Sequence, residues 1–173
     1  LGRESRAEEL ITELEARFAT ARTEHPEFER ATAVVGLIGG KGANYHAYGP
    51  QDLRARFMRS LGFELPAEIA ELAGDQFFTP ISRERLSLLD ADALVWIVNS
   101  PQVREQLEDD PLYQNLEVVS EGRDIFLDVN EPLAGALSFS TVLSLPFALD
   151  QLVPQLFAAV DGDPATEPTP VSP

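Results

Sequence analysis

Ala-Val-Val-Gly-Leu-Ile at residues 33–38 is the stretch that decides the fold, and Ala-Leu-Val-Trp-Ile-Val at residues 93–98 repeats its pattern. Each is a short, unbroken apolar run, which is typical of a strand buried on both faces of a parallel sheet. Segments with helical periodicity lie between and around these runs. Strands that alternate with helices indicate an α/β domain, and we expect a three-layer sandwich with a mostly parallel central sheet.

A long amphipathic helix is predicted before the first strand, over residues 4–24. Leu10, Leu14 and Phe18 recur there at helical spacing among Glu, Arg and Thr residues. Pro26 blocks the continuation of this helix. The sheet is therefore expected to follow a long helix.

Two further helices are predicted between the apolar runs. Residues 39–49 are too rich in glycine for a regular element, so they are expected to form a loop. Pro50 suits the first turn of the helix that follows, and Gly62 ends that helix. Ser82 is placed to cap the free N–H groups of the next helix, which ends at Asp90.

The second half of the chain continues the alternation. Pro101 begins a short helix, and two brief extended stretches are predicted at residues 118–119 and 125–127. A final helix is predicted over residues 139–159, with a kink at Pro146.

Composition limits the function classes. With 173 residues and 44% hydrophobic content, the chain is expected to form one domain. A formal net charge of -16 disfavours nucleic acid and anionic membranes as partners, because both repel an acidic protein. The absence of cysteine excludes disulfides and thiolate metal sites. Because the chain starts with leucine and has no leader-like segment, we expect a fragment or a processed product.

Candidate ligand contacts follow the two apolar runs, because ligands of open α/β sheets bind beyond the carboxyl ends of the strands. These segments offer aromatic rings, amides and cations that suit a bulky, anionic ligand. The candidates in these segments are Lys41, Asn44, Tyr45, His46, Tyr48, Trp96 and Asn99. Arg123, which lies outside them, is added as a further cation for a ligand that is usually anionic. The alternatives are a flexible connector for residues 39–49 and a core position for Trp96.

Catalytic and metal-binding patterns are missing from the sequence. Neither His25 nor His46 is accompanied by the Gly-x-Ser-x-Gly elbow of a serine hydrolase. The glycines at residues 39–42 lack the spacing of a phosphate-binding loop. The two histidines do not have metal-ligand spacing, and the acidic residues are scattered as on solvated helix faces. We therefore expect no catalytic residue, no metal site and no cofactor.

Four ordered groups of segments carry a family resemblance. They are Ser-Arg-Glu-Arg-Leu at 82–86 with Leu-Asp-Ala-Asp-Ala-Leu-Val at 89–95, Asp-Pro-Leu-Tyr-Gln-Asn-Leu at 110–116, Gly-Arg at 122–123 with Ile-Phe-Leu-Asp at 125–128, and Leu-Ser-Leu-Pro-Phe-Ala-Leu-Asp at 143–150. Together they resemble the C-terminal half of the iron-siderophore and cobalamin class of periplasmic binding proteins, which serve bacterial ABC importers. The similarity covers residues 5–160. Asp110 and Tyr113 depart mildly from the asparagine and tryptophan that are common in that class.

The resemblance implies part of an interlobe helix at residues 1–25, the C-terminal lobe of a two-lobed binding protein at 26–160, and a missing N-terminal lobe. Residues 161–173 are rich in Pro, Thr, Glu and Asp, and a disordered tail is expected there. The resemblance further implies that an Fe(III)-siderophore complex binds between the lobes and that no reaction is catalysed. It also implies a monomer located in the periplasm or at the cell surface, with any lipid anchor on the missing part.

Glu84 is the docking residue that the resemblance implies. In this class a glutamate on each lobe meets arginines of the ABC transporter permease subunits, and Glu84 is the matching position. Its spacing alone indicates only an acidic residue in the first turn of a helix, where its negative charge interacts favourably with the helix dipole. Two alternative functions stay open, namely a small α/β enzyme domain that uses His46 and a non-catalytic acidic interaction module.

Overall fold

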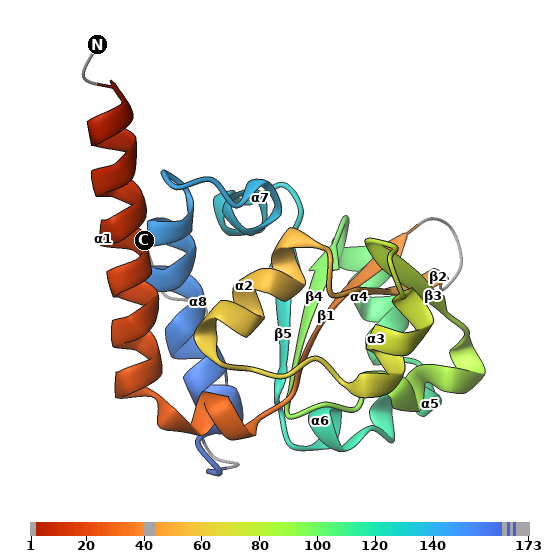
Figure 1. Ribbon diagram of the computed structural model, residues 1–173. Helices are drawn as coiled ribbons and strands as arrows, with labels where there is room; N and C mark the ends of the chain where they lie inside the picture. Colours follow the sequence, from red (N-terminus) through yellow and green to blue (C-terminus); the bar gives the residue numbers. More distant parts are fainter. Residues whose placement is uncertain (1–2, 40–43, 164–165, 167, 169–173) are drawn as a thin grey trace.

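Helices cover both faces of a five-stranded sheet in the computed structural model, which describes residues 3–39, 44–163, 166 and 168 (Figure 1). The strands are β1 (Ala33–Gly39), β2 (Asn44–Tyr48), β3 (Phe78–Ile81), β4 (Ala93–Val98) and β5 (Asp124–Asp128). The α-helices are α1 (Arg3–Glu24), α2 (Leu53–Leu61), α3 (Ala67–Ala73), α4 (Pro101–Glu108), α5 (Pro111–Gln114), α6 (Glu117–Ser120), α7 (Pro132–Phe139) and α8 (Leu145–Val160). The 3₁₀ helices are η1 (Pro26–Arg30) and η2 (Arg83–Leu89).

The strand order β3-β2-β1-β4-β5 places the two decisive apolar runs side by side as β1 and β4. β1 pairs in parallel with β4, and β4 pairs in parallel with β5. β2 is antiparallel to both β1 and β3, so among the described strands only β2 runs against the others. The predicted α/β fold with a mostly parallel sheet is confirmed.

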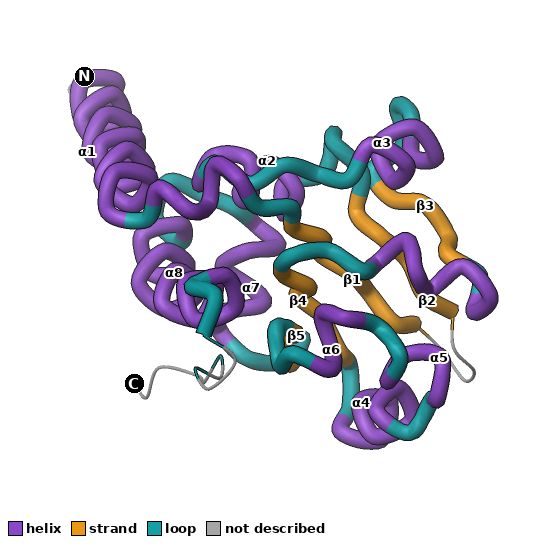
Figure 2. The backbone as a smooth tube through the Cα atoms, turned by 90° about the horizontal axis from the view of Figure 1, so that it is seen from below, coloured by secondary structure: helices purple, strands orange, loops and turns teal. Residues whose placement is uncertain are grey.

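Two apolar cores lie on the two faces of the sheet. Helices flank the strands on both sides, which makes the domain three-layered (Figure 2). Side chains from α1, α2, α7 and α8 fill the first core, and side chains from α3, η2, α4, α5 and α6 fill the second. Alternation along the strands divides the sheet residues, so Val35 and Val95 face the first core while Val34 and Leu94 face the second. β4 is buried along its whole length, as its unbroken apolar run predicts.

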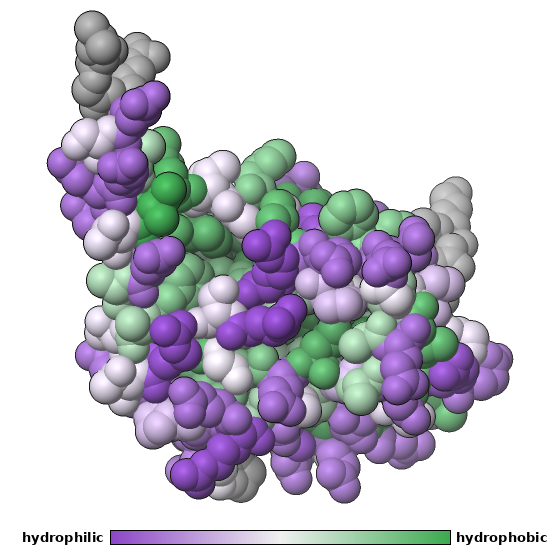
Figure 3. Space-filling model, in the orientation of Figure 1, coloured by the Kyte–Doolittle hydropathy of each residue, from purple (hydrophilic) through white to green (hydrophobic). Residues whose placement is uncertain are grey.

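The long predicted helix is present as α1, and it packs on the domain mainly through its second half. Phe18 and Ala21 are buried in the first core, and Arg17 forms an ion pair with Asp150 of α8. The side of α1 that faces away from the domain is hydrophilic (Figure 3). The first half of the helix extends past the edge of the sheet (Figure 1).

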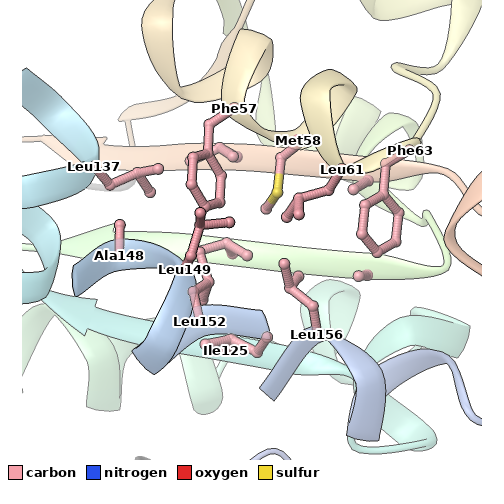
Figure 4. Close-up of a cluster of buried hydrophobic side chains, with 14 of the residues drawn as sticks. Phe57, Met58, Leu61, Phe63, Ile125, Leu137, Ala148, Leu149, Leu152 and Leu156 are labelled. Carbon is pink, nitrogen blue, oxygen red and sulfur yellow. The ribbon is translucent and has the colours of Figure 1, made fainter. Parts of the chain in front are cut away.

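The first core is formed where α2, α7 and α8 meet over the parallel strands (Figure 4). Phe57 and Leu61 of α2 lie opposite Leu149 and Leu152 of α8, with Ile125 of β5 beneath them. Burial of each such side chain contributes about 1.5–3 kcal/mol relative to its exposure to water. This cluster fixes α2 and α8 on the sheet.

A tight contact between β1 and β4 explains the glycine within the first apolar run. Gly36 is the register partner of Trp96, whose side chain is fully buried. A Cβ atom at position 36 would lie 2.5 Å from the Cζ3 atom of Trp96. Only glycine leaves room for the indole ring, so the residue at position 36 of β1 and the residue at position 96 of β4 fit each other in shape.

Two aspartates of the Leu-Asp-Ala-Asp segment join neighbouring parts of the fold. The Asp90 carboxylate accepts hydrogen bonds from the Glu117 and Val118 N–H groups, 3.1 and 2.9 Å away, and so caps α6 from outside that helix. The Asp92 carboxylate accepts hydrogen bonds from the N–H and the hydroxyl of Thr32, at 2.7 and 2.8 Å. Asp92 thereby connects the start of β4 to the start of β1.

Residues 44–48 form a strand, which corrects the predicted glycine-rich loop over 39–49. Tyr45 and Ala47 are buried in the second core, and the strand is held between β1 and β3. In the sequence, the alternation of inward and outward side chains over residues 44–48 is hard to recognise because glycines and polar residues surround it. α3 and β3, which follow α2, were not predicted.

Three smaller expectations are also corrected. α2 is capped by Asp52, whose carboxylate accepts from the Arg54 N–H, and Pro50 lies before the helix. Ser82 precedes a 3₁₀ helix and does not cap it through its hydroxyl. Residues 118–119, which were predicted to be extended, belong to α6 because Asp90 caps that helix from a distance.

The predicted helix over 139–159 is divided into the end of α7 and all of α8. Ser140 adopts a left-handed conformation with φ of 46° and ends α7. Pro146 occupies the first turn of α8, where its missing N–H costs nothing, and produces no kink. Most of residues 161–173 lie outside the described residues, so disorder there stays a prediction.

Replacing Gly36 by alanine tests the contact with Trp96. The added methyl group overlaps the indole, so we expect Gly36→Ala to lower the free energy of unfolding by about 1–3 kcal/mol in urea titrations. Gly135→Ala is the matched control, because a Cβ there meets no atom within 4 Å and the residue lies in α7. That control should gain about 0.5–1 kcal/mol. Equal stability of the two variants would contradict the packing argument.

Candidate functional site

The carboxyl ends of β1, β4 and β5 lie along one edge of the sheet, which we call the carboxyl edge. These strands end at Gly39, Val98 and Asp128. In open α/β sheets, ligands bind beyond this edge because several strand-to-helix connections converge there. The carboxyl edge is therefore the candidate ligand surface.

Asn99 and His46 are the predicted contacts with accessible surface at this edge. Asn99 is exposed directly after β4. His46 is half-buried and lies edge-on against Phe78, with 5.3 Å between ring centroids. Lys41 lies outside the described residues, as does the side chain of Asn44. The surface thus offers an amide and an imidazole beside an exposed ring.

His46 lacks the surroundings of a catalytic base. Its Nδ1 atom is buried and has no hydrogen-bond partner in the described part of the chain. A histidine that activates a nucleophile in a triad is oriented by a carboxylate or hydroxyl partner on its second ring nitrogen. The structure therefore gives no support to the alternative of an enzyme domain that uses His46.

Trp96 does not lie on the ligand surface but belongs to a buried network of hydrogen bonds. Its indole N–H donates to the Tyr113 hydroxyl at 3.0 Å, and that hydroxyl donates to the Asp124 carboxylate at 2.6 Å. Burial raises the pKa of Tyr113 and the pKa of Asp124. Trp96 has no exposed surface, so the predicted ligand contact is wrong and the core alternative is correct.

Tyr45 is also a core residue. It faces the second core, and its hydroxyl donates to the Asp110 carboxylate at 3.3 Å. Burial, with the nearby Asp110 charge, raises the pKa of Tyr45 to about 12. Only 2% of the residue is exposed, which contradicts its predicted contact with a ligand. The strand assignment of residues 44–48 explains the error, because alternate side chains must point inward.

Tyr48 lies on the opposite face of the sheet, beneath a guanidinium group that sequence analysis missed. The Cζ atom of Arg54 lies 4.2 Å from the centre of the Tyr48 ring. Arg54 also donates to both carboxylate oxygens of Asp52, at 3.0 and 2.9 Å, and to the Ser138 hydroxyl at 3.3 Å. This group connects the start of α2 to α7, which follows the carboxyl end of β5 (Figure 1). An Asp-x-Arg pattern is too common to indicate it from sequence.

Arg123 lies at the other end of the sheet and cannot share a site with Asn99. It directly precedes β5, and its guanidinium group is 2.9 Å from Glu121 and 3.5 Å from Asp92. A cavity of about 600 Å³ opens beside it, between η1 and the end of α8. The amino ends of the strands border this cavity, so Arg123 lies away from the carboxyl edge, and its contact with a ligand stays a prediction.

Glu84 is exposed in the first turn of η2. η2 follows β3, and β3 runs in the same direction as β1, so Glu84 also lies toward the carboxyl edge. A hydrogen bond from its own backbone N–H and another from the Ser82 hydroxyl hold the pKa of the Glu84 carboxyl below its ordinary value. The side chain therefore presents an ionised, oriented carboxylate to solvent.

An apolar patch lies where α7 and α8 are connected. Phe139 and Leu143 are 75% and 73% exposed, and Phe147 at the start of α8 is 42% exposed. The connection lies beside the projecting half of α1 (Figure 1), and apolar side chains gather next to that part of α1 in Figure 3. Exposed apolar groups of this size and proximity mark surfaces that associate with another protein surface.

The described residues form neither a candidate metal site nor a candidate membrane-spanning helix. No group of three or more histidine or acidic side chains there could hold a metal ion. None of the helices in residues 3–39 and 44–163 is long and apolar enough to cross a bilayer.

The profile of a family described as "Periplasmic binding protein" matches residues 1–130. The chain belongs to this family. Family members are binding proteins, so the absence of a catalytic pattern in the sequence agrees with membership. The expected relationship to siderophore-binding members is confirmed by solved structures with the same fold. No protein with a curated function matches the sequence directly.

Solved structures of periplasmic binding proteins share the fold over nearly the whole chain. PiaA from Streptococcus pneumoniae TIGR4, in complex with ferrichrome, is 26% identical with a TM-score of 0.75, over 93% of this chain and 55% of PiaA. A periplasmic solute binding protein from Mycobacterium smegmatis is 32% identical with a TM-score of 0.71, over 88% of this chain and 50% of its own. FhuD2 from Staphylococcus aureus, with bound ferrioxamine B, shares the fold at 19% identity with a TM-score of 0.73, over 92% of this chain and 60% of its own. The chain thus spans about half the length of these relatives.

The Asp110 carboxylate predicts a specific dependence of stability on pH. Hydrogen bonds from Arg83 are the main cause of its lowered pKa in the folded state. A lowered folded-state pKa stabilises the fold above the ordinary aspartate value of 3.8, and this contribution is lost as the pH falls below that value. In urea titrations over that acidic range, we expect Asp110→Asn to lose less stability than the parent chain.

Asp124→Asn is the control of opposite sign. Burial raises the pKa of Asp124, so its contribution is present at low pH and is lost as the pH rises through the folded-state value. Removing this carboxylate should therefore flatten the stability profile on the side above 3.8. Parallel profiles for the parent chain and Asp110→Asn would refute the assignment of Asp110 as an ionised, paired group.

Proposed function

We propose that this chain is the C-terminal lobe of a two-lobed receptor that binds ferric siderophores and delivers them to an ABC importer. The observation that carries the proposal is the match to PiaA in complex with ferrichrome, over 93% of this chain but 55% of PiaA. FhuD2 with bound ferrioxamine B has the same fold. The shared cargo of these two relatives is an iron complex of a siderophore, which is therefore the proposed ligand.

The apolar patch and the projecting half of α1 support a second lobe. Phe139 and Leu143 would be unfavourably exposed if the chain acted alone, because each is about three-quarters exposed. Contact with a second lobe would bury them and would surround the first half of α1. In this arrangement α1 is the interlobe helix, and the carboxyl edge of the sheet forms one wall of the ligand cleft.

The ligand surface of this lobe would combine Asn99, His46 and the Arg54 group. An amide and an imidazole can hydrogen-bond to the oxygen atoms of an iron complex. Arg54 is held by Asp52 and Ser138, so it would act as a fixed cation beside the cleft. A neutral to anionic ferric complex fits these groups, and the protein itself contributes no metal ligand in this proposal.

The proposed partners and location follow from the same assignment. Glu84 would meet arginine side chains of the permease, and the receptor would work as a monomer outside the cytoplasm. A formal net charge of -16 supports attraction to a cationic permease surface and repulsion from anionic lipid headgroups. Because the lobe binds cargo without changing it, no reaction is assigned.

Ligand affinity should depend on the second lobe. Half of the enclosing surface is absent from residues 1–173, so we expect this chain to bind ferric ferrichrome and ferrioxamine B at least about 100-fold more weakly than the complete receptor. Fluorescence-quenching titrations of both proteins measure the difference. Nanomolar affinity of the chain on its own would refute a cleft formed by two lobes.

Glu84→Ala in the complete receptor separates docking from ligand binding. Ionic docking sets orientation and association rate, so we expect binding to the permease and iron uptake to fall about 10-fold, with the siderophore affinity unchanged within about two-fold. Parallel transport assays and quenching titrations measure the two effects. Glu105→Ala is a matched control, because Glu105 is an exposed acid on α4. Equal losses of uptake and ligand affinity would remove Glu84 from the docking role.

A further inference from the structure

Glu84 is carried by η2, a helix whose own hydrogen bonds hold it only weakly. It is a 3₁₀ helix of seven residues, and Arg85 within it has non-helical backbone angles. Hydrogen bonds in 3₁₀ helices have poorer geometry than those in α-helices, so short 3₁₀ segments depend on outside contacts. Leu86 and Leu89 anchor one side of η2 in the second core. Local hydrogen bonds orient the Glu84 carboxylate within the first turn of η2, and a further contact joins that turn to the rest of the domain.

An ion pair between Arg83 and Asp110 supplies that further contact. The Arg83 Nε and Nη2 atoms donate to the two oxygens of Asp110, both at 2.7 Å, in a bidentate arrangement. The Arg83 side chain is 50% exposed, whereas that of Asp110 is only 8% exposed. The pair therefore ties the surface residue next to Glu84 to a fixed point within the domain.

Asp110 is itself held from two other directions. Its carboxylate accepts a hydrogen bond from the Leu112 N–H at 2.9 Å and caps α5. It also accepts a hydrogen bond from the Tyr45 hydroxyl of β2. Three elements, namely β2, α5 and η2, thus meet at one carboxylate. An asparagine at this position could keep the cap but could not form the charged, bidentate pair.

We propose that the Arg83–Asp110 pair is a positioning device that fixes the direction of Glu84 for docking to the permease. This inference rests on the proposed docking role of Glu84. Arg83 acts through its neighbour and does not itself need to touch the permease. Tyr45 connects the same point to β2, so Glu84 keeps a constant position relative to the ligand surface at the carboxyl edge.

The sign of the effect distinguishes positioning from simple charge attraction. Arg83→Gln removes one positive charge beside Glu84, and charge alone would strengthen the attraction to a cationic permease surface. Loss of positioning would weaken docking instead. Arg85→Gln makes the same change in charge two residues away, and Arg85 forms no ion pair with a described residue. It is therefore the matched control.

The experiment measures the affinity of the complete receptor for its permease in detergent or nanodiscs, together with ferric siderophore affinity. We expect Arg83→Gln and Asp110→Asn each to weaken permease binding about three- to ten-fold, with ligand affinity unchanged, while Arg85→Gln binds as well as the parent or better. In a Glu84→Ala background, Arg83→Gln should have little further effect, because a positioning residue acts only through the group that it positions.

Each other outcome has a defined meaning. If Glu84→Ala weakens permease binding but Arg83→Gln does not, or if the two effects are additive, the positioning role is overturned and the docking role stands. If Glu84→Ala has no effect on permease binding, the proposed docking function fails and the positioning role fails with it. Asp110→Asn keeps the α5 cap, so its thermal unfolding curve shows whether any loss of docking reflects global unfolding.

Discussion

The parallel pairing of β1 with β4 is the constraint on which the rest of the structure depends. Both strands are apolar along nearly their whole length, so both faces of the sheet must be covered before either strand is stable in water. Gly36 provides space for the indole of Trp96, and this fit sets the register between the two strands. The two helix layers follow from this requirement. The carboxyl edge, where the candidate ligand surface lies, is fixed by the same pairing.

The sequence predicts those parts of the fold that are determined by local pattern. The apolar runs gave β1 and β4, helical periodicity gave α1, and Pro101 marked the start of α4. The errors occurred where a distant residue decides the outcome. Val118 and Val119 favour extended structure by propensity, but Asp90 caps the backbone there and α6 forms. β2 depends on its position between two other strands, which no local pattern reveals.

The candidate site was harder to predict than the fold for a related reason. Aromatic residues near glycine-rich turns occur both on ligand surfaces and in cores, and only the strand alternation separates the two cases. Tyr45 and Trp96 are inside because they face the second core, whereas His46 and Asn99 retain accessible surface. Arg123 directly precedes β5 and therefore lies at the amino end of that strand, away from the carboxyl edge. The Arg54 group was missed because its partners come from α2, β2 and α7.

The family signature and the ligand surface are therefore different sets of residues, and the physical reason is visible in the aspartates. Asp90 caps α6, Asp92 joins β4 to β1, and Asp110 ties η2 to α5. Each satisfies backbone or charged groups that would otherwise lose hydrogen bonds on burial, so each contributes to the stability of this arrangement of strands and helices. Residues of the candidate ligand surface, such as the exposed Asn99, have no such structural role, so they are free to differ between sequences with this fold. It follows that a signature of this kind identifies the fold, while the residues that would select a ligand lie outside the signature.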